Sequence, residues 1–119
     1  MKLWLDDFRP APEGFHHAYT VEEAIHMIRR WENEIDYTWE QYILGVYDKE
    51  RFDRFIKCYT IQIISCDYDL GEGNAEGIKL LNWLEATGRN YPIRIHTMNV
   101  VGRENMRRII ERNGWKEIK

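Results

Sequence analysis

The sequence predicts a single three-layer α/β domain, with a mainly parallel sheet of about five strands covered by helices on both faces. The chain has 119 residues, which is about the size of one domain. Short apolar runs alternate along it with longer segments whose apolar residues recur at helical spacing, and this alternation is typical of parallel sheets. The segment from residue 67 to residue 93 is long enough for a crossover between two parallel strands.

Five segments are predicted to be strands. Residues 60–66 are the clearest case, because β-branched residues are frequent there. The run at residues 2–5 is apolar until Asp6 and Asp7 end it, which suits a buried strand. The other predicted strands are residues 15–19, 93–97 and 115–118.

Three helices are predicted from their end signals and spacing. The first begins after Thr20, which forms a capping box with Glu23. The others cover residues 75–86 and 102–113, and each ends at a glycine. Residues 33–58 have an ambiguous pattern with a helical segment at 48–57, and we interpret them as an insertion packed on the edge of the domain.

The composition indicates a folded protein of a reducing compartment. Hydrophobic residues make up 44% and charged residues 31% of the chain, which argues against disorder. The two cysteines, Cys58 and Cys66, do not suggest a disulfide framework. The N-terminal apolar run is too short for a signal peptide or a membrane span, so we expect a cytoplasmic protein.

The net charge of −3 is unevenly distributed along the chain. From Gly88 onward, eight Lys and Arg residues stand against three Glu residues. This segment is either a solvated basic helix face or a patch that attracts a phosphate-bearing ligand. The overall acidity argues against nonspecific binding of long duplex nucleic acid.

Polar residues that can perform chemistry follow three of the predicted strands. Ligands of open α/β sheets bind outside the carboxyl ends of the strands, so these residues should gather at one edge. Carboxylates brought together repel one another unless a positive charge lies between them, and Mg²⁺ is a suitable cation. The alternative is that each Asp is only a turn or cap residue. The three groups are Asp6-Asp7, Asp67-Tyr68-Asp69 and His96-Thr97-Met98-Asn99.

Two further features near residue 100 suggest acid–base chemistry and anion binding. His96 could act as a general acid or base, although a lone histidine is often only packed or hydrogen-bonded. Asn99, Gly102 and Arg103 surround the start of the last helix, where free N–H groups and an arginine can bind a phosphate. The alternative is a capped helix with a surface arginine. No Walker loop, dinucleotide-binding fingerprint or nucleophile elbow is present.

Three sequence blocks together resemble a known family, the cyclic-phosphate processing receiver domains. The resemblance covers almost the whole chain except residues 33–58 and implies a flavodoxin/receiver-like fold. The blocks are Leu5-Asp6-Asp7-x-Arg9-Pro10, Ser65-x-Asp67-x-Asp69-Leu70-Gly71 and Ile95-His96-Thr97-Met98-Asn99-x-x-Gly102-Arg103-x-Asn105-Met106. The chain differs from signalling receivers because no Lys-Pro pair closes the last strand, which argues against phosphorelay signalling.

The resemblance implies a role for each candidate residue. A divalent cation, Mg²⁺ or Mn²⁺, would be held by Asp6, Asp7 and Asp67, with Asp69 supporting them. The catalytic candidates are His96, Asp67 and Thr97, and the substrate-binding candidates are Arg9, Asn99 and Arg103. Asp67 is either a metal ligand only or also a transient nucleophile.

The function predicted from these residues is metal-dependent processing of a cyclic or terminal phosphate on a nucleotide or RNA end. The expected partner is a phosphorylated small molecule, a nucleotide or an RNA terminus, and neither a membrane nor long duplex DNA. Two alternatives stay open. One is a module that binds a phosphate or nucleotide without turnover, and the other is a stand-alone receiver that is phosphorylated on Asp67.

Overall fold

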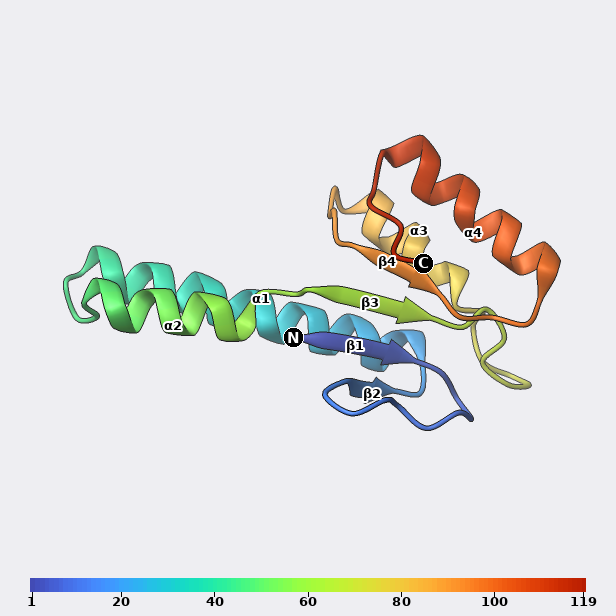
Figure 1. The fold of residues 1–119 in the computed structure, drawn as a ribbon, viewed down its shortest axis with the longest axis horizontal. Helices are drawn as coiled ribbons and strands as arrows, with labels where there is room; N and C mark the ends of the chain where they lie inside the picture. Colours follow the sequence, from blue (N-terminus) through green and yellow to red (C-terminus); the bar gives the residue numbers. More distant parts are fainter.

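A computed structural model describes residues 1–119 and contains a four-stranded, entirely parallel sheet with the order β2-β1-β3-β4 (Figure 1). It confirms the predicted α/β class. The fifth predicted strand is wrong, because residues 115–118 contribute only an isolated bridge between Ile93 and Glu117. The elements are β1 (Lys2–Leu5), β2 (His16–Ala18), α1 (Val21–Ile43), α2 (Lys49–Tyr59), β3 (Ile63–Cys66), α3 (Ile78–Ala86), β4 (Ile93–Ile95) and α4 (Val100–Asn113).

The helices that cover the sheet form one layer on one face, and not the two layers that were predicted. Helix α1 packs beside α3, and α3 packs beside α4. The links from β2 to β3 and from β3 to β4 run in the same direction across the sheet, so right-handed crossovers bring their helices to the same side. Only the link from β1 to β2 runs in the opposite direction, and residues 6–15 form no helix there.

The hydrophobic core lies between the sheet and this helical layer. It consists of 19 buried apolar residues, including Leu3, Leu5 and Ile64 from the strands and Leu81 and Ile110 from the helices. Alternation along each strand sends every second side chain to the core. The intervening residues of β1, β3 and β4 therefore face the side of the sheet that carries no helix.

The loop between β1 and β2 covers part of that second face. Trp4 of β1 points there, and its indole N–H donates a 3.0 Å hydrogen bond to the backbone oxygen of Arg9. Phe15 packs edge-on against the Trp4 ring, with 6.0 Å between the ring centroids. Trp4 is thus buried against a loop and not against a helix.

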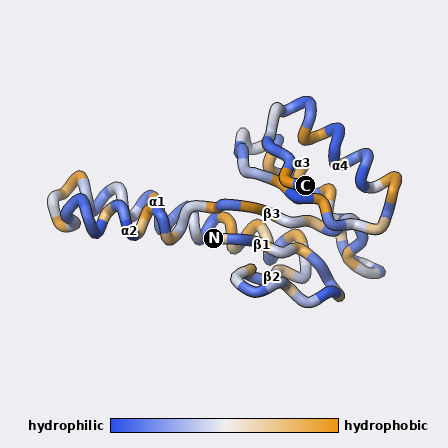
Figure 2. The backbone as a smooth tube through the Cα atoms, in the orientation of Figure 1, coloured by the Kyte–Doolittle hydropathy of each residue, from blue (hydrophilic) through white to orange (hydrophobic).

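Residues 33–58 form most of a helical hairpin that projects from the sheet (Figure 1). The helix predicted at 48–57 is confirmed as α2. Helix α1 begins after Thr20 as predicted and continues to Ile43, so it includes the first part of the segment with the ambiguous pattern. The projection gives the molecule dimensions of 50 × 29 × 24 Å. Hydrophobic and hydrophilic residues alternate along both hairpin helices (Figure 2), yet α2 has no fully buried residue. No helix combines the length and apolar character required to cross a bilayer.

Candidate functional site

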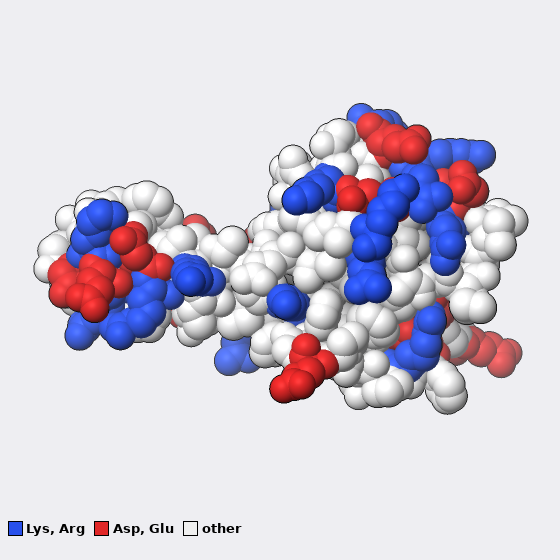
Figure 3. Space-filling view, viewed as in Figure 1, with Lys and Arg blue, Asp and Glu red and all other residues white.

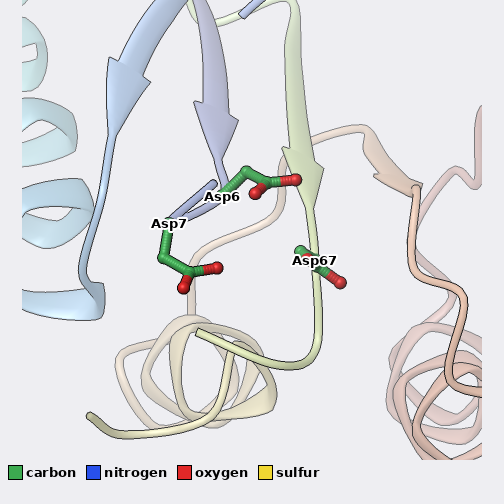
Figure 4. A group of neighbouring side chains, drawn as sticks. All are labelled: Asp6, Asp7 and Asp67. Atoms are coloured by element: carbon green, nitrogen blue, oxygen red, sulfur yellow. The ribbon is translucent and has the colours of Figure 1, made fainter. Parts of the chain in front are cut away.

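Three carboxylates from two separate parts of the chain meet at the carboxyl edge of the sheet (Figure 4). Leu5 of β1 lies opposite Cys66 of β3, so the residues that follow these strands are neighbours. Carboxylate oxygens of Asp6, Asp7 and Asp67 all lie within 4.8 Å of one another. The parallel register therefore produces the convergence that the strand ends predicted.

Asp6 is fully buried and has all of its oxygen sites engaged. Its Oδ1 accepts hydrogen bonds from the backbone N–H groups of Phe8 and Arg9, both at 2.8 Å. Its Oδ2 accepts from the Arg9 Nε at 3.0 Å and lies 3.1 Å from the His96 Nε2. Burial favours a higher pKa for Asp6, but these donors together outweigh it and hold the pKa below its usual value. Asp6 is therefore a fixed anion inside the site.

The positive charge between the carboxylates comes from Arg9. Its Nε lies 3.0 Å from the Asp6 Oδ2, and its Nη2 lies 3.3 Å from the Asp67 Oδ2. The same Nη2 donates a 2.7 Å hydrogen bond to the backbone oxygen of His96. The guanidinium thus joins β1, β3 and β4 at their ends, and it reduces the repulsion that the carboxylates would otherwise exert on one another. Its side chain is 39% exposed, so it can also reach solvent.

His96 is held on three sides. Its Nε2 faces the Asp6 Oδ2, and its Nδ1 lies 2.7 Å from the Ser65 Oγ. The ring stacks on Trp4, with 3.7 Å between the centroids and an interplanar angle of 2°. Because a carboxylate only accepts, the neutral ring must carry its proton on Nε2, and Nδ1 then accepts from the Ser65 hydroxyl. Burial lowers the pKa of His96, and Asp6 offsets this only in part, so the ring is neutral at pH 7.

The start of α4 supplies the remaining predicted residues. Asn99 is the N-cap of α4, and its Oδ1 accepts a 2.8 Å hydrogen bond from the Gly102 N–H. Arg103 donates from its Nη2 to the backbone oxygen of Thr97, a residue that is almost completely buried. Asp69 lies outside the group of three carboxylates and accepts a 3.3 Å hydrogen bond from the Asn99 Nδ2.

The model of one protein family, described as the cyclic-phosphate processing receiver domain, matches residues 1–44 and 38–112. The chain belongs to this family. A search of curated proteins finds no match. A search of solved structures also finds none.

The carboxylates of this receiver domain provide the oxygen ligands that Mg²⁺ prefers. Ligand oxygens of an octahedral Mg²⁺ lie about 3 Å apart when adjacent and about 4 Å apart when opposite, so the three Asp oxygens, which lie within 4.8 Å of one another, would move closer to bind one ion. The exposed Asp7 has no hydrogen-bond partner for its side chain. Asp6, in contrast, would have to release Arg9 or His96 before it could bind a cation. The donor set therefore fits Mg²⁺ chemically, with Asp7 as the free ligand, whereas Asp67 would also have to release Arg9 from its Oδ2.

Gly71 allows the loop after β3 to approach Asp7. It has a φ of +87°, and a Cβ atom there would lie 2.8 Å from the Asp7 Oδ2. Any other residue would be strained by that backbone conformation and would press against the carboxylate. In the sequence Gly71 is only one residue of the motif that begins at Ser65. The fold shows that a glycine at this position lets the loop lie against the Asp7 carboxylate.

Two further residues, Trp4 and Ser65, belong to the receiver domain's site without having been predicted there. Trp4 lies opposite Ser65 in the register of β1 and β3, and both point to the face without helices. The sequence contains a signal for Ser65, because it precedes Asp67 by two residues and a strand period of two places both on one face. The stacking of Trp4 on His96 depends on distant strands and had no local signal.

Proposed function

We propose that this receiver domain hydrolyses a cyclic phosphate on a nucleotide or RNA end at the carboxyl edge of its sheet, with Mg²⁺ or Mn²⁺ as the cofactor. One observation carries the proposal: His96 lies 3.1 Å from the buried Asp6 carboxylate, directly beside the guanidinium of Arg9. A base supported by a carboxylate and a cation for the phosphate are the two groups that such a reaction needs.

Hydrolysis of a cyclic phosphodiester forms a bond from water to phosphorus and breaks one bond from phosphorus to a ring oxygen. The water must lose a proton and the ring oxygen must gain one. His96 would take up this proton on Nδ1, the nitrogen without a hydrogen, once that atom releases the Ser65 hydroxyl, and the Asp6 anion at Nε2 would stabilise the resulting imidazolium. Ser65 and Trp4 hold the ring in one orientation, which reduces the reorganisation needed during the reaction.

Recognition of the phosphate is assigned to groups around the mouth of the site. Arg9 is partly exposed and can present N–H groups to phosphate oxygens. Asn99 and Arg103 lie at the start of α4, whose N-terminal end favours anions. Thr97 is 1% exposed, so we assign it to supporting Asn99, whose N–H donates to the Thr97 Oγ1 at 3.2 Å, more than to direct contact with substrate.

The divalent cation would be held by Asp7, with Asp67 and Asp6 joining as Arg9 turns away from them. When bound, the cation would supply Lewis-acid polarisation of a phosphoryl oxygen. Asp69 would support this shell from the loop after β3. Asp67 would also be able to serve as a transient nucleophile once Arg9 releases its Oδ2, and trapping of a phosphorylated Asp67 would identify that role.

The experiment is a product assay on purified protein with a panel of 2′,3′-cyclic nucleotides and RNA ends that carry a cyclic phosphate. Each substrate is incubated with Mg²⁺, Mn²⁺ or EDTA, and monophosphate products are separated by chromatography. We expect turnover with a metal ion, and we expect His96→Gln to reduce the rate of product formation by about a hundredfold or more. His26→Gln is the matched control, because His26 is exposed on α1 away from the site.

A panel left unchanged under all conditions would contradict the proposal. Tight binding of the same compounds without product would instead support the alternative of a binding module. Uptake of a phosphoryl group from acetyl phosphate onto Asp67 would support the alternative of a stand-alone receiver.

A further inference from the structure

The positive charge of the C-terminal part of the chain is only partly neutralised by ion pairs. Arg89 pairs with Glu32, and Arg112 pairs with Glu85. Arg94 of β4, in contrast, is exposed and has neither an ion pair nor a hydrogen bond from its side chain. Figure 3 shows Lys and Arg side chains gathered over β4, α4 and the C-terminal segment, with Asp and Glu side chains between them.

A cleft of about 300 Å³ lies within this basic region, between β4, α4 and the C-terminal segment. Arg107 forms a bidentate pair with Glu117, at 3.0 Å for each contact, and so fixes one wall without adding net charge. Four cationic side chains and one carboxylate side chain line the cleft, so the side chains there carry an excess of positive charge. The polar lining residues are Arg94, His96, Arg103, Arg107, Glu117 and Lys119.

The cleft adjoins the candidate reaction site. His96 is one of the residues that line it, and the ring of His96 contacts Asp6 through Nε2. Arg103 also lines it, while its Nη2 donates to the backbone of Thr97. A ligand whose reacting phosphate lies beside His96 would therefore extend into the cleft with its next group, and the charge there selects a second anion.

We propose that this cleft is a second phosphate site, which holds a phosphate other than the one that reacts. The inference rests on the proposed function and adds a substrate requirement to it: the preferred substrate carries at least two phosphate groups. The second phosphate could belong to the adjoining nucleotide of an RNA end or to the other side of a mononucleotide. In both cases Arg94 would make a charge-assisted contact with it.

The test is equilibrium binding, measured by calorimetry in EDTA so that turnover does not interfere. The probes are adenosine 2′,3′-cyclic phosphate, the same nucleotide with an added 5′-phosphate, and a tetranucleotide that ends in a cyclic phosphate. We expect both multiply charged probes to bind at least about tenfold more tightly than the first one. The relative gains of the two probes identify whether the nucleotide or the chain supplies the second phosphate.

Substitutions test whether Arg94 causes the tighter binding of the multiply charged probes. Arg94→Glu should reduce the tenfold preference to about one and lower the salt dependence of tetranucleotide binding by about one ion contact. Arg108→Glu makes the same charge change on the exposed side of α4, outside the cleft, and should keep the preference. Arg94→Gln removes the positive charge without adding a carboxylate that repels the phosphate. It should give a ratio of affinities, for the multiply charged probes against the first probe, between the values of the wild type and Arg94→Glu.

Two outcomes would overturn the inference: equal binding of all three probes by the unchanged protein, or a preference that survives in Arg94→Glu. Because the readout is binding, it is independent of the product assay. A binding preference without turnover would support the second phosphate site and contradict the proposed hydrolysis. Turnover without a binding preference would support the hydrolysis and contradict the second phosphate site.

Discussion

Arg9 and a divalent cation should compete for the same carboxylates, and Arg9→Gln tests this competition. The guanidinium contacts Asp6 and Asp67 at 3.0 and 3.3 Å, and these are two of the three residues whose oxygens could hold an ion. A bound ion would repel the guanidinium, so part of its binding free energy must be spent on displacing Arg9. Glutamine keeps hydrogen-bonding capacity but removes the charge.

The structure sets the size of the effect. A pair of unit charges at about 4 Å interacts by about 4 kcal/mol at the effective dielectric constant near a protein surface. Solvent screening at the 39% exposed Arg9 side chain reduces the net value to about 1–2 kcal/mol. We therefore expect Arg9→Gln to lower the free energy of unfolding by about 1–2 kcal/mol without metal. The same change should tighten Mn²⁺ binding by about tenfold, because 1.4 kcal/mol corresponds to a factor of ten.

The assay combines Mn²⁺ titration, followed by electron paramagnetic resonance, with denaturant unfolding in EDTA. Arg30→Gln is the control, since Arg30 is exposed on α1 and has no ion-pair partner. Weaker or unchanged Mn²⁺ binding in Arg9→Gln would refute the reasoning, because it would mean that the ion and the guanidinium do not share a place. Loss of Mn²⁺ binding in Asp7→Asn would independently identify the exposed ligand.

Three other substitutions give expected outcomes. Gly102→Ala should destabilise the protein by about 1–3 kcal/mol in thermal unfolding, because its Cβ would press into the ring of Tyr68; an unchanged melting temperature would mean that this loop yields freely. Ser65→Ala should cost about 1 kcal/mol in denaturant unfolding, because it removes the partner of the His96 Nδ1, and a neutral result would count against that hydrogen bond. Glu32→Gln should make the melting temperature less dependent on acid. Burial favours a higher pKa for Glu32, but its partners, the Arg89 guanidinium and the Tyr91 phenol, outweigh burial and lower the pKa. The stabilisation by the ionised Glu32 is therefore present above about pH 4 and is lost as the pH falls further. Equal acid sensitivity of the variant and the wild type would contradict this contribution of Glu32.

Most of the strands and helices could be predicted from local signals. The apolar run at β1 and the β-branched run at β3 gave two central strands, and Thr20 marks the start of α1, with its Oγ1 accepting a 3.1 Å hydrogen bond from the Glu23 N–H. The end of α1 was not predictable, because residues 33–43 lack a cap and mix aromatic and charged side chains. They are helical because they pair with α2 in the hairpin.

Part of the candidate site was also predictable. Asp6, Asp7 and Asp67 follow predicted strands, and a parallel register is enough to bring them together. The ion pairs that these carboxylates form within the protein were not predictable. The sequence predicts Arg9 to be a loop residue that binds substrate, yet in the fold its guanidinium lies between the carboxylates of Asp6 and Asp67.

The amino-acid sequence by itself determined which residues stand at the ends of the strands, because apolar runs and the polar residues that stop them are local properties. The tertiary structure alone decided which charges meet. The order β2-β1-β3-β4 puts Arg9 between two carboxylates and brings His96 from β4 against Asp6, 90 residues away along the chain. Local sequence cannot specify such contacts, since they depend on the packing of the strands and on the handedness of the connections between them.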